Sequence, residues 1–393
     1  MSFNKSKLAL AVAAAAGLTF SSGAFATNGI LQAGNGMVAH GFGGAGLSNA
    51  GEAAAGMDNP ALISQTGDAL GVGWSIFMPD REWAAPAYGI TAKSDSKMFS
   101  IPQVAFTSKI NDSLNWGIMA YALGGMNTDY RTDLFSGNPS TVDLSGMIVA
   151  PTMSWALNKN ISFGGSLLIA YENFRGRNVL GSGNADEGST TGYGVKLGAD
   201  WKITDGIAVS AMVQPKISMG EITWWKNFVS TAPNAPSDTA LTTPNEFGIG
   251  SKFAIGKNVD ILADVLYYQW TSVDVFKFFG WEDQTVLKLG AEFRPSDKLA
   301  LRAGLNYGKS PIQGDVLPPA GGGFATAVML NSYFPAVSEY HFTVGMGYKM
   351  DKNMAFNAYY LYSPKTTISD SITPVEISMS QNAFGLGVNY QTK

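Results

Sequence analysis

The stretch YHFTVGMGYKM, from Tyr340 to Met350, alternates between two kinds of side chain. One set is apolar and mostly large: Tyr340, Phe342, Val344, Met346, Tyr348 and Met350. The other set is small or polar: His341, Thr343, Gly345, Gly347 and Lys349. Successive side chains of a β-strand point to opposite faces of its sheet, so the stretch predicts a strand with one apolar face. It has about the ten residues that a tilted strand needs to cross the hydrocarbon core of a membrane.

The same alternation recurs from about residue 69 to the end of the 393-residue chain. We predict fourteen strands, at 69–78, 99–110, 113–123, 144–157, 160–172, 190–203, 206–219, 245–255, 258–270, 284–294, 298–308, 339–350, 353–363 and 378–390. Such strands build either a soluble sandwich, in which the apolar face meets a second sheet, or a membrane barrel, in which it meets lipid.

Three features favour the barrel. The strands are long enough to span lipid. Aromatic residues recur near strand ends, as in the interfacial girdles of such barrels, at Trp155, Tyr171, Trp201, Trp270, Tyr307 and Tyr390. Tight turns such as 158–159 and 351–352 alternate with long connections such as 220–244 and 309–338, which is the outer-membrane pattern. The fold class is therefore all-β: a transmembrane antiparallel β-barrel of fourteen strands over residues 69–393.

The N-terminus has the three parts of a secretory signal peptide. Lys5 and Lys7 are basic, residues 8–20 are apolar, and residues 24–26 form an A-x-A cleavage site. We expect residues 1–26 to be removed and the mature chain to lie in the outer membrane of a Gram-negative cell. The chain has no Cys, so no disulfide is expected, and its net charge of −4 argues against a nucleic-acid partner.

Residues 27–68 lie between the signal peptide and the first strand. Their stretch GEAAAGMDNPALI, from Gly51 to Ile63, has neither strand alternation nor a helix face. Pro60 fixes a local bend, and the Asn59 side chain can bond nearby backbone and hold a turn. Small residues would keep such a segment slim inside a barrel.

Short ordered motifs give the chain a family resemblance. They are Gly43–Gly46, Gly51–Ala54, Asn59–Leu62, Leu241–Pro244, Trp270–Ser272, Trp281–Gln284, Leu289–Glu292 and Leu301–Gly304. The chain resembles the outer-membrane long-chain fatty acid transporters (FadL) and the TodX-type aromatic hydrocarbon channels. The resemblance implies a fourteen-stranded barrel that contains an N-terminal hatch, here residues 27–68. It also implies passive uptake of hydrophobic molecules, captured by external loops and released through a lateral window.

The resemblance assigns hatch and gating roles to Gly51, Glu52, Asn59, Pro60 and Ala61. Purely structural packing is the alternative for these residues. The family's third strand carries a kink beside the window, and the paired Gly124 and Gly125 fall at that strand. Paired glycines in a strand mark a bend, although they also suit a plain strand end.

An aromatic cluster of Trp224, Trp225, Phe228 and Val229 lies in the loop after the seventh strand. It is either a hydrophobic capture site or an anchor at the membrane interface.

Three cations, Lys196, Lys288 and Arg302, fall on lumen faces together with Asp200, Glu246 and Glu292. We expect them mostly to pair with one another, since buried charges are kept when paired. The alternative is that one of the three binds a ligand carboxylate. The sequence does not say which.

Other site chemistries are weakly represented. With two His and no Cys, a zinc site is nearly excluded, and we expect no metal and no cofactor. The G-x-G-x-x-G at Gly41–Gly46 lacks the βαβ context of a dinucleotide site. His341 has polar neighbours, and we expect them to satisfy its hydrogen bonds rather than to make it a catalytic base.

The predicted function is passive outer-membrane transport, by a monomer in lipid, of long-chain fatty acids or aromatic hydrocarbons, without enzymatic activity. A general porin for polar solutes, a lipid-acting barrel enzyme and an adhesive barrel are the alternatives.

Overall fold

The computed structural model describes residues 28–131, 137–323 and 325–392, and its principal element is one antiparallel sheet. The sheet has sixteen strands, of which β2 (Ile90–Lys93) and β9 (Ser218–Met219) are short additions. The remaining fourteen are β1 (Asp68–Ala85), β3 (Phe99–Lys109), β4 (Leu114–Tyr130), β5 (Ser140–Ala156), β6 (Ile161–Arg177), β7 (Ala185–Thr204), β8 (Ile207–Gln214), β10 (Asn245–Ile255), β11 (Val259–Gln269), β12 (Gln284–Phe293), β13 (Leu299–Gly308), β14 (Tyr340–Lys349), β15 (Met354–Ser369) and β16 (Glu376–Thr392).

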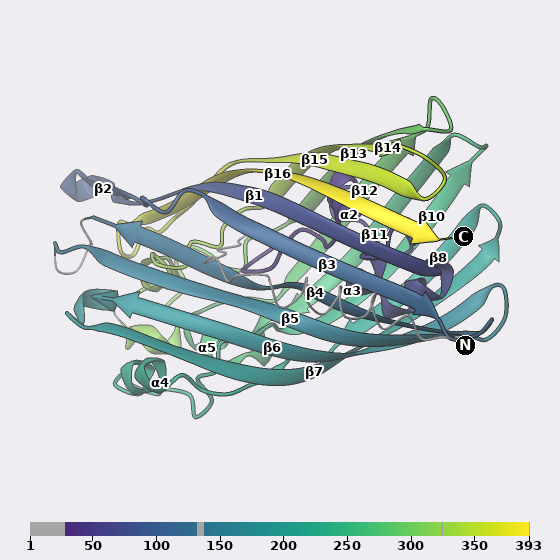
Figure 1. The fold of residues 1–393 in the computed structure, drawn as a ribbon. Helices are drawn as coiled ribbons and strands as arrows, with labels where there is room; N and C mark the ends of the chain where they lie inside the picture. The colour runs from purple at the N-terminus through teal and green to yellow at the C-terminus, as the bar shows by residue number, and fades with distance from the viewer. Residues whose placement is uncertain (1–27, 132–136, 324, 393) are drawn as a thin grey trace.

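The last strand pairs with the first and closes the sheet into a barrel. The β1–β16 ladder runs from Asp68↔Thr392 to Ala84↔Glu376. Closure matters because a lipid-facing backbone N–H or C=O finds no water to bond. The predicted fourteen-stranded antiparallel barrel is confirmed, and Figure 1 shows its strands side by side around the barrel.

The two ends of the barrel differ. Tight turns join strands at the end on the right of Figure 1, where β16 also ends, and long loops leave the other end. The loops carry α4 (Thr223–Val229), α5 (Asp274–Phe278) and α6 (Ala327–Leu330). Several strands continue into this end beyond their predicted limits, including β4 and β7. Within the part of the chain that the structure describes, no helix is long and apolar enough to cross a membrane.

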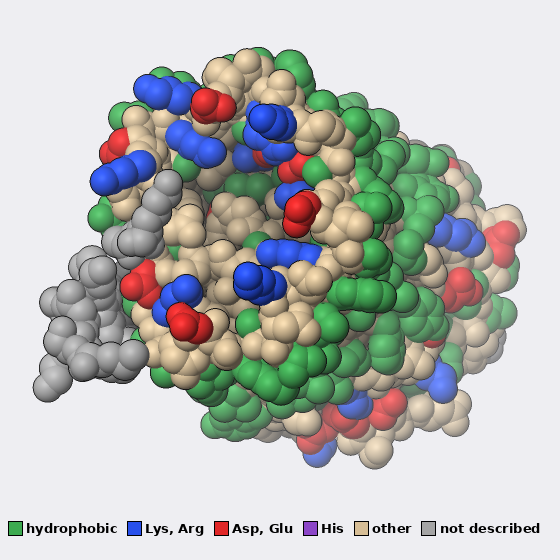
Figure 2. All heavy atoms as spheres, turned by 90° about the vertical axis from the view of Figure 1, so that its right-hand side faces the viewer, with side chains coloured by type: hydrophobic (Ala, Val, Ile, Leu, Met, Phe, Trp, Pro, Cys, Tyr) green, Lys and Arg blue, Asp and Glu red, His purple; other side chains and the backbone are tan. Residues whose placement is uncertain are grey.

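Large apolar side chains cover the outer wall, as Figure 2 shows. They include Trp74, Phe163, Leu197, Ile249, Leu289, Val344, Phe356 and Leu386, all well exposed. Trp155 and Trp201 lie on this wall, 49% and 52% exposed, as expected of girdle residues. Trp270 is fully buried, so its predicted place in the girdle is wrong. It begins a 3₁₀ turn that leads the chain inward after β11, and its ring packs on Trp281.

Residues 28–67, here called the N-terminal segment, lie inside the barrel and are mostly buried. The segment contains α2 (Met37–Gly41), α3 (Ala55–Asp58) and the 3₁₀ helix η1 (Pro60–Gln65). Helix α2 lies against β13–β16, and η1 lies against β4–β7 on the opposite wall. The segment therefore crosses the lumen from wall to wall. The predicted signal peptide lies outside the described residues.

The outward position of Val344 gives a test of the lipid-facing wall. Val344 lies at the middle of β14 and is 57% exposed. We expect Val344→Arg to lower the free energy of unfolding in lipid vesicles by about 2–4 kcal/mol, because the charge would sit near the bilayer midplane. Denaturant titration of the wild type and the variant in lipid vesicles measures this free energy of unfolding. The control Met350→Arg, just beyond the turn end of β14 and 49% exposed, should change this free energy by at most about 1 kcal/mol, because the charge would lie near the interface. Equal effects of the two variants would contradict this orientation.

Candidate functional site in the barrel interior

Inward side chains of the barrel wall bond the irregular backbone of the N-terminal segment. Asp264 Oδ2 accepts hydrogen bonds from Gly46 N at 2.8 Å and Leu47 N at 3.0 Å. Thr343 Oγ1 accepts one from Gly43 N at 2.8 Å. Buried backbone groups need partners, and outside a helix or strand side chains must supply them. The Gly41–Gly46 motif is thus held against the wall.

Asn59 and Pro60 lie at the opposite wall. Asn59 is fully buried, and its Nδ2 donates to Leu47 O at 2.9 Å and to Ala199 O at 3.2 Å. Its Oδ1 accepts from Ala61 N at 3.0 Å and so caps η1. One side chain therefore ties two parts of the segment to β7.

Glycines of the wall make room for this contact. A Cβ at Gly198 would lie 1.9 Å from Asn59 Oδ1, and a Cβ at Gly164 would lie 2.3 Å from the Pro60 carbonyl carbon. Separations of this size are clashes, so only glycine lets the segment approach the wall here.

Glu52 lies in the middle of the segment and is nearly buried. Its Oε1 accepts a hydrogen bond from Val38 N at 2.9 Å, which joins Glu52 to α2. Burial raises the pKa of Glu52 to about 7, against the opposing effects of this hydrogen bond and of Arg302. Burial also raises the pKa of Asp58, whose Oδ1 accepts from Asn35. Gly51, by contrast, is exposed and borders a cavity that opens at the end with the tight turns.

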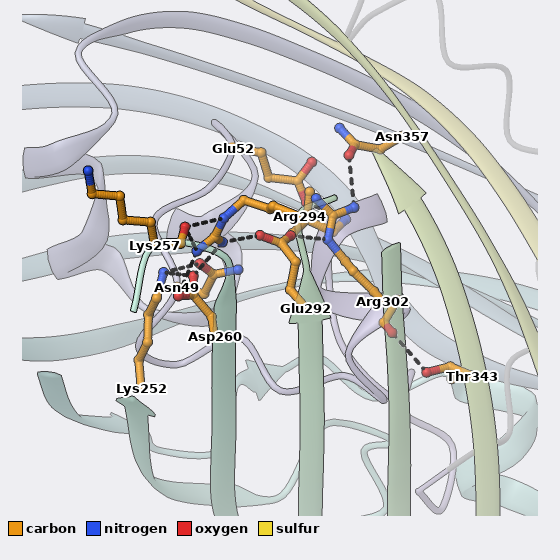
Figure 3. A network of polar contacts seen from close by, with 12 residues as sticks. Asn49, Glu52, Lys252, Lys257, Asp260, Glu292, Arg294, Arg302, Thr343 and Asn357 are labelled. Carbon is orange, nitrogen blue, oxygen red and sulfur yellow. Dashed lines mark hydrogen bonds and ion pairs between the residues drawn. The ribbon is translucent and has the colours of Figure 1, made fainter. Parts of the chain in front are cut away.

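A charged network lines that cavity, which measures about 390 Å³. Figure 3 shows Arg294 between Asp260 and Glu292, and Arg302 between Glu292 and Asn357. Arg302 Nε donates to Glu292 Oε2 at 2.7 Å. In Figure 2 the cavity is the depression that Lys and Arg surround. Of the three predicted cations, Arg302 is thus engaged by a carboxylate.

A second cavity, of about 60 Å³, lies between the segment and the wall formed by β4, β5 and β7–β12. Lys196, Lys288, Asp58, Glu246 and Asp264 line it. Lys196 Nζ donates to Met57 O at 2.7 Å. Lys288 is buried and forms no hydrogen bond or ion pair with any residue that the structure describes. Of the three cations it is the one that no described residue bonds directly, although Asp58, Glu246 and Asp264 lie around the same cavity.

The third spanning strand, β4, is irregular where the paired glycines lie. The β4–β5 register shifts between Ala122 and Gly124, and Gly124 has φ 146°, which favours glycine. The β3–β4 ladder ends at Val104↔Ala120, although β3 stays paired with β1 as far as Phe99. Gly125 N donates instead to Ile30 O of the segment at 3.1 Å. The wall and the segment therefore meet at this bulge.

The aromatic loop cluster forms helix α4. Trp225 and Val229 are buried, whereas Trp224 and Phe228 are partly exposed, so the cluster is not an open surface patch. The Trp225 ring stacks on Phe228 at 5.7 Å and on Phe279 at 5.8 Å.

Trp225 and Phe228 line a narrow cavity of about 20 Å³ among the external loops. Its other aromatic walls are Phe276, Phe279, Trp281, Tyr333 and Phe334. None of the described residues that line it is charged, and the one amide among them, Asn331, accepts a hydrogen bond from Trp281 Nε1 at 2.7 Å. Sequence reasoning placed only the Trp224–Val229 cluster here, so the contributions of these other loops are new findings of the structure. The aromatic run Phe276–Trp281 was the available signal.

The two histidines have different environments. His40 stacks on Tyr359 at 4.4 Å, and its Nδ1 lies 2.7 Å from Gly36 O. His341 is fully buried, and neither ring nitrogen has a hydrogen-bond partner among the described residues. The prediction that neighbours satisfy His341 is wrong, because the polar residues beside it in sequence point elsewhere or bond the segment.

Comparisons with known proteins agree with this architecture. The family model described as outer membrane protein transport protein (OMPP1/FadL/TodX) matches residues 12–393. A Neisseria meningitidis serogroup B protein, which its name places in the outer membrane, is 22% identical over 379 residues, covering 77% of this chain and 79% of that protein.

Two solved structures are similar in fold. The Pseudomonas putida toluene transporter TodX has a TM-score of 0.71 at 17% identity, covering 92% of this chain and 99% of that one. A Pseudomonas aeruginosa FadL homologue has a TM-score of 0.68 at 14% identity, covering 93% and 100%.

The hydrogen bonds of the Asn59 side chain give a test of how the N-terminal segment is held in place. Asn59→Ala would leave one buried N–H and two buried carbonyls without this partner, each worth about 1 kcal/mol. We expect amide hydrogen exchange in residues 45–62 to quicken at least about tenfold while the strand amides stay protected. Asn49→Ala is the control, since Asn49 accepts only a long 3.4 Å bond from Lys252. Unchanged exchange in Asn59→Ala would show that packing alone holds the segment.

Proposed function

This chain belongs to the outer membrane protein transport protein family (OMPP1/FadL/TodX), and we propose that it carries hydrophobic small molecules passively across the outer membrane. The observation that supports this best is the uncharged aromatic cavity among the external loops, above a barrel that its own N-terminal segment crosses. Both relatives of known structure bear names of this kind, a toluene transporter and a FadL homologue.

Capture is the first step of the proposed route. Burial of apolar surface stabilises a bound molecule by about 25 cal/mol per Å², without any energy source. Trp225, Phe228 and Phe279 offer flat faces against which an aromatic ring or an alkyl chain can pack. The cavity is narrow, so we propose that these loops move apart to admit the substrate.

The 60 Å³ cavity lined by Lys196 and Lys288 is the proposed second binding site on the route. Lys288 is the cation that could bind a substrate carboxylate, such as that of a long-chain fatty acid, by a charge-assisted hydrogen bond. An aromatic hydrocarbon would use only the apolar part of the route. Both substrate classes therefore stay within the proposal.

Release is the third step, and we propose that it is lateral. Asn59, Pro60 and Ala61 would act as the gate with Gly51 and Glu52 in the same moving segment. The unpaired stretch between β3 and β4, beside Gly124, is the proposed exit into the membrane. Movement of the segment would break the Gly125–Ile30 hydrogen bond at this place.

The alternatives make different demands. A general porin needs a water-filled lumen, whereas here the segment bridges the lumen at many hydrogen bonds. A lipid-acting enzyme needs a base that is hydrogen-bonded to its nucleophile, and His341 has no such partner among the described residues.

Uptake by whole cells tests the proposal. Cells that express the protein should take up labelled toluene or oleate faster than cells without it, with no gain for a polar sugar. Trp225→Ala should lower uptake at limiting concentration about tenfold, because a stacking contact worth about 1.4 kcal/mol is lost. Trp74→Ala, on the lipid face, is the control. Faster sugar uptake without hydrophobic uptake would favour the porin.

A removable cross-link tests lateral release. The chain has no Cys, so Cys at positions 103 and 121, just beyond the Val104↔Ala120 pair, can be joined by a cleavable bifunctional reagent. We expect the cross-link to reduce uptake at least about fivefold, because it would hold β3 and β4 together at the proposed exit. Cleavage of the reagent should restore uptake. The matched inward pair Ala105→Cys and Met119→Cys, within the intact ladder, should have no effect. Full uptake through a cross-linked barrel would rule out this exit.

A further inference from the structure

Six inward polar side chains stand side by side on six consecutive strands of the barrel wall. They are Asp264, Lys288, Asn306, His341, Ser363 and Gln381, on β11 to β16, and are called here the polar row. The registers Asp264↔Lys288, Lys288↔Asn306, Asn306↔His341 and Ser363↔Gln381 place neighbours directly opposite each other. The pair Phe342↔Tyr362 places His341 beside Ser363. Directly opposite side chains in an antiparallel pair lie about 5 Å apart.

The last four members of the row are fully buried: Asn306, His341, Ser363 and Gln381 are each 0% exposed. None of their seven side-chain nitrogen and oxygen atoms has a hydrogen-bond partner among the described residues. Asp264 Oδ1 also has none, and Lys288 makes no hydrogen bond or ion pair there. Buried polar groups in native proteins are nearly always bonded, so each such group requires a partner from elsewhere. Here they are adjacent, so one small polar group could bond two or three neighbouring members of the row at once.

The row begins at a cavity and is bordered by apolar side chains. Asp264 and Lys288, the first two members of the row, line the 60 Å³ cavity. The other four members follow on the next four strands, β13 to β16. Val286, Leu361, Met379 and Ala383, each two residues away from a row member on its own strand, are buried apolar neighbours. Thr343, two residues from His341, is polar and bonds Gly43 N instead. A polar row with apolar side chains beside it on β12, β15 and β16 complements an apolar molecule that carries one small polar group.

The chemistry of the row selects that polar group. The amides of Asn306 and Gln381, the neutral imidazole of His341 and the hydroxyl of Ser363 each offer both a donor and an acceptor. A hydroxyl group also donates and accepts, so it can satisfy both kinds of atom at once. A carboxylate only accepts, so it would suit Lys288 but leave the acceptors of the row unbonded.

We propose that the polar row binds the hydroxyl group of an apolar alcohol or phenol on its way through the barrel. The inference rests on the proposed transport of hydrophobic molecules and narrows its substrate class. A hydroxyl group is a single heavy atom, so the row has to yield little space to it. The apolar body of the molecule would pack against the apolar side chains beside the row, such as Val286, Leu361 and Met379.

Three probes with the same ring isolate the polar group: toluene, p-cresol, which adds a hydroxyl, and p-toluate, which carries a carboxylate. Equilibrium dialysis of the full-length mature barrel in lipid nanodiscs, against empty nanodiscs, gives each affinity free of partitioning into lipid. We expect p-cresol to bind about tenfold more tightly than toluene, because a site that bonds a hydroxyl discriminates against the analogue without it. Asn306→Leu and Gln381→Leu should each remove most of this preference and leave toluene within about twofold.

The controls separate binding from folding. Asn382→Leu changes the neighbouring residue, whose side chain bonds Tyr360 on the outer wall, and should keep the full preference for p-cresol. Folded barrels are selected by their shifted electrophoretic mobility before heating. Ser363→Ala is the substitute for any variant that does not fold.

Several results would overturn the proposal. Equal affinities for toluene and p-cresol in the wild type would mean that the row binds water only. A preference for p-toluate that Asn306→Leu abolishes would assign the row to carboxylates. Equal loss of all three probes in the variants would make the row structural. Absence of toluene binding to the wild type would instead count against the proposed transport function.

Discussion

The hydrocarbon core of a membrane offers no partner to a peptide N–H or C=O, and this constraint governs the whole molecule. It requires every spanning strand to be paired on both sides, which β16 and β1 complete by their long ladder. It also requires an apolar outer face, and thereby the alternation seen in β14. A prominent interruption among the described strands lies between β3 and β4, and there the carbonyl of Ile30, in the interior segment, accepts a hydrogen bond from Gly125 N.

Closing the wall creates a lumen in which the opposite rule applies. The N-terminal segment brings irregular backbone into the lumen, and its N–H groups must be bonded there. Asp264, Thr343 and Asn389 supply acceptors from the wall. Gly164 and Gly198 supply the space. Small inward residues and scattered polar ones are thus two parts of one solution, which explains why the lumen face of so many strands has this composition.

The sequence could predict what depends on local order. Alternation in stretches such as Tyr340–Met350 identified the strands, and the alternation of short and long connections gave their number and direction. Register is different, because it joins residues far apart in the chain. Sequence placed Lys196, Lys288 and Arg302 inside, but only the register shows that Glu292 bonds Arg302 while no described residue forms a hydrogen bond or ion pair with Lys288.

The same limit explains the errors. His341 was judged by its neighbours in sequence, whereas Asn306 and Ser363 are the side chains beside it on adjacent strands. Trp270 has the position of a girdle residue in the chain, but the 3₁₀ turn that follows β11 carries it inward. Loop aromatics such as Trp225 and Phe279 converge only when the barrel brings their loops together.

The closing seam has a consequence for biogenesis. Residues of β16, the last strand to be synthesised, hold the N-terminal segment: Asn389 accepts from Ala53 N, and Gln391 donates to Thr66 O. The segment leads directly into β1, the strand that β16 must find. Sealing of the barrel and docking of its contents are therefore coupled, since a chain without β16 would lose both the seam and these two hydrogen bonds to the segment. The seam between β1 and β16 thus couples closure of the wall to docking of the N-terminal segment.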